Sequence, residues 1–171
     1  MNTFLRIACM IVGCLFLFTT AATSQTKTQQ QKAEKALLSY LHKLCKEYTT
    51  NEMSIELGTI HQPYTINNGI LSVVRKHQNE SNPAVPFFVK TSIAISAIED
   101  VFLDYYIGFA GVNNQSVKEE KSDSSIFRFT STGTMNLMHI APVGDGDHGY
   151  AVQTKLLKLV TDLKKLYKVD K

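Results

Sequence analysis

The sequence predicts an α+β fold: an N-terminal helix, an antiparallel sheet of five or six strands, and a C-terminal amphipathic helix packed on that sheet. Two observations carry this prediction. Near both ends of the mature chain, apolar residues recur every three or four positions, as on a helix. In the middle of the chain, apolar and polar residues alternate, as on strands. The apolar faces of the helices and of the strands are buried most simply when the helices cover one face of an antiparallel sheet. A strongly bent sheet or a partial barrel fits the same pattern.

The first 24 residues have the layout of a secretory signal peptide. Arg6 precedes an apolar run at residues 7–18, and small residues then lead to an expected cleavage site after Ser24. The run is shorter than the about 20 residues that a membrane-spanning helix needs. Two alternatives stay open: the segment is retained as an anchor, or Cys14 is acylated as in a lipoprotein. We therefore predict a secreted protein, or one of the periplasm or cell envelope.

Removal of this segment changes the composition of the chain. The 171 residues become 147, with 17 Lys and Arg against 15 Asp and Glu, so the formal charge falls from +3 to +2. Of the three cysteines only Cys45 stays, which excludes a disulfide within the chain and leaves the fold to its hydrophobic core. The low charge, the few arginines and the lack of tryptophan argue against a nucleic-acid-binding protein.

The mature chain is expected to begin with a polar leader and then a helix. Residues 25–31 have no apolar periodicity, so we interpret them as a spacer before a single α+β domain at residues 32–171. Between residues 32 and 48 the apolar side chains form one stripe, which predicts an amphipathic helix. Cys45 lies on this stripe and is expected to be a core thiol rather than a reactive one.

The middle of the chain supplies the strands. Asn67-Asn68-Gly69 separates two apolar segments, and Asn-Gly readily takes the positive φ angles of a tight hairpin turn. Residues 77–86 and 112–125 are polar and are expected to be loops, and Thr132-Gly133 is expected to be the turn of a last strand pair. Strand-like patterns occur in seven segments, from which we expect a sheet of five or six strands: residues 53–57, 64–66, 70–74, 87–95, 101–109, 126–129 and 135–140.

The C-terminal segment predicts the second helix. Apolar residues recur at spacings of three and four from Val152 to Tyr167, and lysines occupy the opposite side. The apolar stripe is expected to cover one face of the sheet. A lysine-rich face can contact anionic lipid or a partner, but solvated lysines explain this pattern more simply.

The loop before this helix imitates two kinds of ligand site. Gly144, Gly146 and Gly149 have the spacing of a dinucleotide-binding loop, but Asp145 and Asp147 would repel a pyrophosphate and no second parallel strand follows. We therefore predict no cofactor. The same aspartates are weak candidates for a metal site, although the further ligands of an EF-hand are missing. A glycine turn with an aspartate that caps the helix is the simpler interpretation.

Weak catalytic candidates flank the same loop. His139 and His148 stand on either side of it, and Asp147 could orient a histidine base. The sequence has no nucleophile-elbow motif, and its histidines lack the spacing of zinc ligands. The acidic group Glu99-Asp100 with Asp104 more simply marks a turn and an exposed strand position.

Export combined with weak catalytic motifs favours a non-enzymatic binding or interaction module at or outside the cell envelope. The expected partner is a protein, a peptide at a free sheet edge, or a glycan, and nucleic acid is not expected. Membrane contact is expected only through a retained N-terminal segment. Two alternatives stay open: a small secreted enzyme that uses the His139–His148 loop, and an envelope protein anchored by its uncleaved N-terminus.

Overall fold

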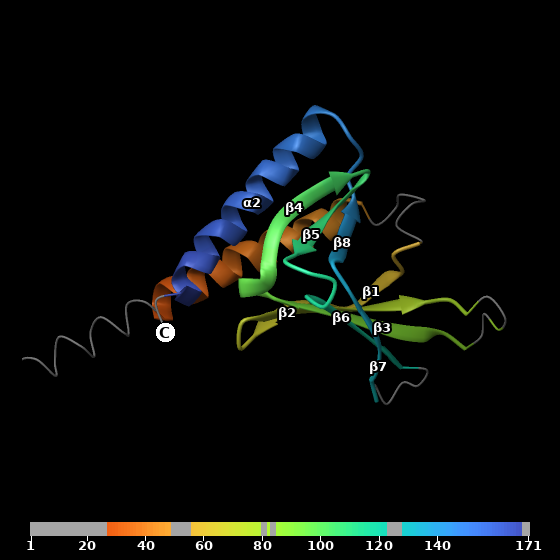
Figure 1. Ribbon diagram of the computed structural model, residues 1–171. Helices are drawn as coiled ribbons and strands as arrows, with labels where there is room; N and C mark the ends of the chain where they lie inside the picture. Colours follow the sequence, from red (N-terminus) through yellow and green to blue (C-terminus); the bar gives the residue numbers. More distant parts are fainter. Residues whose placement is uncertain (1–26, 49–55, 80–81, 83–84, 123–127, 169–171) are drawn as a thin grey trace, which may run out of the picture.

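Figure 1 shows the chain as a computed structural model, which describes residues 27–48, 56–79, 82, 85–122 and 128–168. These residues form an N-terminal helix, two antiparallel sheets and a C-terminal helix, which confirms the predicted α+β class. No helix in the described ranges is long and apolar enough to cross a membrane.

The N-terminal helix covers residues 27–47. The elements after it are β1 (Thr59–Asn67), β2 (Ile70–His77), β3 (Phe87–Ala94), the short 3₁₀ helix η2 (Ile95–Ala97), β4 (Ile98–Asp104), β5 (Tyr106–Gly111), β6 (Val117–Ser122), β7 (Thr130–Met135), β8 (Leu137–Pro142) and α2 (Asp147–Lys168). Several predictions concern residues outside the described part of the chain, namely the signal peptide with Cys14, most of the strand predicted at residues 53–57 and the first half of the strand predicted at residues 126–129.

The N-terminal helix extends further toward the N-terminus than its apolar stripe. Residues 27–31, which the sequence analysis interpreted as a polar leader, are helical, so the helix begins before the predicted start at residue 32. Gln30 donates a hydrogen bond from its side chain to the Glu34 carboxylate at 3.0 Å, one turn later. Such pairs four residues apart support a helical turn that has no apolar face of its own.

Two sheets replace the single sheet that the sequence predicted. The five-stranded sheet has the order β1-β2-β3-β6-β7, and the three-stranded sheet has the order β4-β5-β8. The sequence predicted one sheet of five or six strands; the larger sheet has five, and three further strands form a second sheet, because the chain changes sheet at η2, between β5 and β6, and at Asn136. No closed barrel occurs among the strands described. Periodicity locates strands, but it does not tell which strands pair.

The β1-β2 hairpin confirms the clearest local prediction. Asn67 pairs with Ile70, and the two residues between them, Asn68 and Gly69, have φ angles of 50° and 76°. These left-handed values are what the Asn-Gly pair supplies at low cost.

Three local predictions are wrong. Residues 101–109 do not form one strand, because Tyr105 turns the chain at φ 73° without a glycine and separates β4 from β5. The predicted loop at residues 112–125 contains β6, whose polar side chains are stabilised by pairing with β3, including a 3.1 Å ion pair between Lys90 and Glu120. Thr132-Gly133 lies inside β7 rather than in a turn.

The two helices lie side by side across the three-stranded sheet (Figure 1), and α2 packs against β4 as predicted for a helix that covers a sheet. Contacts tie the helices together along their lengths. The Tyr167 hydroxyl donates to Glu34 at 2.6 Å, and Lys155 lies 4.5 Å from the centre of the Tyr40 ring. Both apolar stripes therefore meet one core, which includes Leu37, Leu41, Leu44, Leu156, Val160 and Leu163.

Candidate functional site

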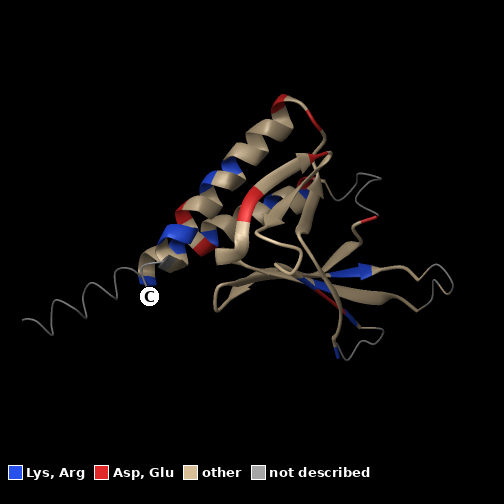
Figure 2. Cartoon of the chain, viewed as in Figure 1, with Lys and Arg blue, Asp and Glu red and all other residues tan. Residues whose placement is uncertain are grey.

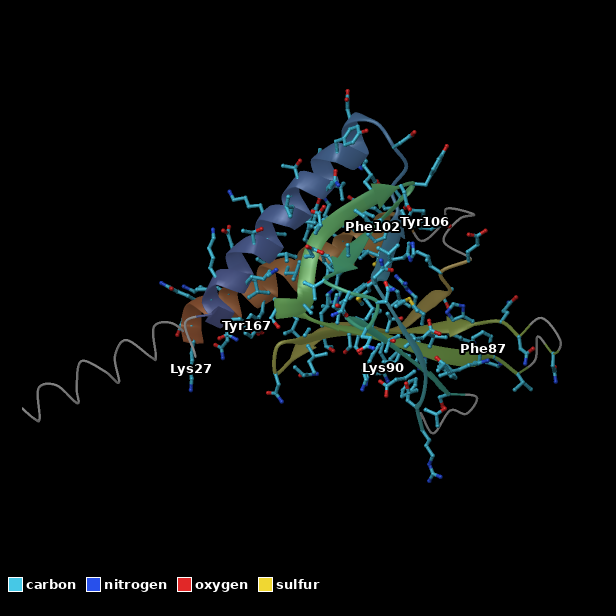
Figure 3. The ribbon with its side chains drawn as sticks, in the orientation of Figure 1. Lys27, Phe87, Lys90, Phe102, Tyr106 and Tyr167 are labelled. Atoms are coloured by element: carbon cyan, nitrogen blue, oxygen red, sulfur yellow. The ribbon has the colours of Figure 1, made fainter. Side chains whose placement is uncertain are left out.

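The predicted catalytic histidines lie in different surroundings. His139 is on β8, paired with Gly108 of β5, and its ring packs edge-on to Phe102 at 5.1 Å and to Tyr106 at 5.4 Å. Because Gly108 has no side chain, the rings of Phe102 and His139 meet across it. Figure 3 shows Phe102 and Tyr106 together beside the three-stranded sheet. Burial in this aromatic cluster lowers the pKa of His139, although the nearby Asp104 carboxylate acts in the opposite direction.

His148 and Asp147 lie in the first turn of α2 and are both exposed. The His148 Nε2 atom shares a 2.6 Å hydrogen bond with the Tyr48 hydroxyl, which comes from the end of the N-terminal helix. His148 therefore joins the two helices, whereas His139 belongs to the aromatic cluster of the small sheet. Neither of the two best-formed pockets in the described part of the chain is lined by His139, His148 or Asp147.

The acidic residues singled out by the sequence lie on the surface. Asp145 and Asp147 are both exposed. The glycine before each of them, Gly144 and Gly146 respectively, has a φ angle of 71° and 86°, as a sharp turn through glycine requires. Figure 2 shows acidic residues at this end of the molecule and lysines along α2. Among the described residues no three His, Cys, Asp or Glu side chains form a cluster that could hold a metal. Glu99, Asp100 and Asp104 are exposed on β4.

A pocket of about 400 Å³ lies elsewhere, where the C-terminal end of the N-terminal helix meets β1, β2 and β8. That volume falls within the range of small-molecule sites in proteins. Much of its wall is apolar and comes from Leu57, Ile60, Pro63, Ala141 and Pro142. The polar lining groups are His42, Cys45, Lys46 and Tyr48 of the helix end, Thr59 of β1, and Arg75 of β2.

The backbone at the start of β1 requires glycine beside this pocket. Gly58 has a φ of +74°, and a Cβ atom there would lie 2.8 Å from the carbonyl oxygen of Lys76 and 2.8 Å from the His77 ring. Glycine therefore lets the chain approach β2 closely and places the pocket residues Thr59 and Ile60 at the mouth.

Arg75 is the most unusual residue of the pocket. Its side chain is 7% exposed, and it alternates inward on β2 with the core residues Leu71 and Val73. Its Nη1 donates to the His139 carbonyl at 3.1 Å, and its Nη2 donates to the Ile140 carbonyl at 2.7 Å and to the Tyr64 hydroxyl at 3.2 Å. Its Nε is buried and has no hydrogen-bond partner among the described residues.

The carbonyl acceptors of Arg75 are available because β8 is an edge strand with a bulge. Ile107 pairs with Ala141 and Gly108 with His139, so Ile140 is an extra residue that the β5 ladder skips. The guanidinium thus links β2 of the large sheet to the edge of the small sheet. Its acceptors are neutral, and no carboxylate in the described part of the chain forms an ion pair with it.

The neighbouring groups of the helix end are held by the same strands. His42 Nε2 donates to the Tyr64 carbonyl at 3.1 Å, and Cys45 Sγ lies 3.9 Å from the Ile140 carbonyl. Burial raises the pKa of the Cys45 thiol to about 11, although the Arg75 charge acts to lower it. The thiol is therefore protonated at neutral pH, and His42 and Cys45 do not form an activated nucleophile pair.

The sequence analysis did not find this site. A signal was present, because Arg75 occupies the inward parity of a strand whose neighbours at that parity are apolar, and a charged residue at a position expected to be buried points to function. Comparison with protein-family models, with curated proteins and with solved structures gave no match. The pocket is therefore interpreted from its own chemistry.

Proposed function

We propose that this protein is an exported, non-catalytic binding protein that holds a small, largely apolar molecule in the pocket beside Arg75, at or outside the cell envelope. The observation that carries the proposal is the pocket itself, which is large enough for a small ligand and has apolar walls around a few fixed polar groups. Export rests on the signal-peptide pattern of residues 1–24, which lie outside the described residues.

The polar groups of the pocket favour binding over catalysis. Arg75 and His42 each hold backbone carbonyls in fixed positions, and the Cys45 thiol stays protonated at neutral pH because burial raises its pKa to about 11. None of the catalytic candidates His139, His148 and Asp147 contributes to the described pocket lining. A secreted enzyme built on these three residues therefore has less support than a binding protein.

A tryptophan placed at the pocket mouth tests the proposal, because the natural chain has none. Ile60 is 38% exposed and lines the pocket, whereas Ile70 is 47% exposed at the other end of the same hairpin and does not contribute to its described lining. The variants Ile60→Trp and Ile70→Trp therefore form a matched pair. We expect dodecanol or dodecanoate to change the emission of Ile60→Trp with saturation and to leave Ile70→Trp unchanged. If neither probe changes Ile60→Trp, the pocket is not a site for apolar molecules and the proposal fails.

A further inference from the structure

We infer that the ligand of this pocket is an amphiphile whose head is a carboxylate, and that Arg75 is the residue that recognises the head while the apolar walls hold the tail. The inference rests on the proposed function, since it names the class of molecule that the same pocket takes. Three features of the site support it: the uncompensated charge of Arg75, the basic character of the polar lining, and the fixed arrangement of the Arg75 guanidinium.

The first feature is a buried positive charge without a counterion. Arg75 donates to the Tyr64 hydroxyl and to the carbonyls of His139 and Ile140, and none of these oxygens carries a charge. Hydrogen bonds to neutral oxygens satisfy donors but do not neutralise a guanidinium that has been removed from water. A ligand carboxylate would supply the missing negative charge.

The second feature is the character of the lining. Arg75, Lys46 and His42 line the pocket, and no Asp or Glu occurs among its described lining residues. The Nε atom of Arg75 is also buried and has no hydrogen-bond partner in the described part of the chain, so the protein does not satisfy every donor of this guanidinium. Charge-assisted hydrogen bonds of this kind are stronger than bonds between neutral groups.

The third feature is the arrangement of the guanidinium. Nη1 and Nη2 are fixed by the bulged edge of β8 and by Tyr64, so the side chain cannot swing out to meet an anion in water. An anion must therefore come to Arg75 through the pocket, whose lining includes the apolar side chains of Ile60 and Pro63. A polar head with an apolar tail fits that path better than a fully hydrated ion such as free phosphate.

A purely structural role is the competing interpretation, in which Arg75 serves only to join the two sheets. Both roles predict that loss of Arg75 disturbs the protein, so stability alone does not separate them. They differ in the head-group preference of the natural pocket. If Arg75 only joins the two sheets, the pocket should bind a carboxylate no more tightly than an alcohol of the same chain length. If Arg75 recognises an anion, the pocket should bind the carboxylate more tightly.

The experiment measures the binding of dodecanoate, dodecanol and dodecylamine to Ile60→Trp, which keeps Arg75 and every other described lining residue of the pocket. We expect dodecanoate to bind at least tenfold more tightly than dodecanol, and dodecylamine to bind most weakly. Adding the substitution Arg75→Met is expected to weaken the binding of dodecanoate about a hundredfold and to remove the preference for dodecanoate over dodecanol. Lys76→Met is the matched control, because Lys76 is the exposed neighbour of Arg75 and contributes no described lining, and it should leave dodecanoate affinity unchanged.

Equal affinities for dodecanoate and dodecanol would overturn the inference and leave the proposed function standing, whereas no binding of any probe would overturn both. A folded Arg75→Met protein with unchanged dodecanoate affinity would also overturn the inference. If Arg75→Met fails to fold, the head-group comparison in Ile60→Trp alone decides. Tighter binding of inorganic phosphate than of dodecanoate would show a site for free anions and would also contradict the inference.

Discussion

Replacing Arg75 with methionine should destabilise the ligand-bound protein far more than the free protein. In the free protein, the substitution leaves the His139 and Ile140 carbonyls without their donor, at a cost of about 1–3 kcal/mol for each buried acceptor. It also removes a buried charge without a counterion, and the burial of such a charge costs several kcal/mol. These two effects oppose each other and are of similar size. We therefore expect a change of no more than about 2 kcal/mol in the free energy of unfolding of the free protein.

The bound protein lacks this compensation, because the ligand carboxylate has neutralised the charge. Dodecanoate at a thousandfold excess over its Kd for the natural protein adds about 4.1 kcal/mol to the free energy of unfolding. If Arg75→Met weakens binding a hundredfold, the same concentration adds only about 1.4 kcal/mol to the variant. The stability gap between natural and variant protein should therefore widen by about 2.7 kcal/mol when dodecanoate is added.

Urea denaturation of both proteins, with and without dodecanoate, measures this gap. The midpoints and slopes give the four free energies of unfolding, and Lys76→Met serves as the control for loss of a positive charge from the same strand. A gap that stays the same in the two conditions would refute the reasoning, because it would mean that Arg75 acts only on the fold and not on the ligand.

Three further predictions follow from the packing and the pKa shifts. Leu156→Ala should lower the free energy of unfolding by about 2–5 kcal/mol in urea titrations, because Leu156 is fully buried where α2 joins the core; a loss below about 1 kcal/mol would contradict this packing. Gly58→Ala should cost about 1–3 kcal/mol and weaken probe binding, because a Cβ atom would meet the Lys76 carbonyl, and unchanged stability with unchanged binding would argue against the backbone described beside the pocket. Alkylation of Cys45 by iodoacetamide should be slow at neutral pH and accelerate up to pH about 11, since burial raises its thiol pKa and only the thiolate reacts. A rate that levels off near the ordinary cysteine pKa would show that the thiol is not buried.

The parts of the fold that the sequence predicted correctly depend on local patterns. The stripes of the two helices repeat within each segment, and Asn68-Gly69 carries its own turn geometry, so neither needs distant residues to be recognised. The errors arise where the local structure is determined by residues that are distant in the sequence. β6 is polar and looks like a loop until pairing with β3 and β7 is known, and Tyr105 makes a tight turn through a φ of 73° that its residue type does not favour.

The site was harder to predict than the fold for the same reason. His139 and His148 lie close in sequence, but one belongs to a ring cluster on β8 and the other to a helix contact with Tyr48, so proximity along the chain was misleading. Arg75 lies more than sixty residues from the β8 carbonyls that it binds. Its inward parity could have identified it as buried, but only the bulge at Ile140 explains how it is held.

The most direct test of the account is the identity of the molecule that the protein carries in its own cells. The protein should be recovered from its native cells under mild conditions, examined intact by mass spectrometry under non-denaturing conditions, and then extracted with solvent. The account predicts a small amphiphile in one-to-one ratio that ionises as a carboxylate and is lost from Arg75→Met but not from Lys76→Met. Recovery of a neutral or cationic molecule, or of a carboxylate that Arg75→Met retains at full occupancy, would contradict it.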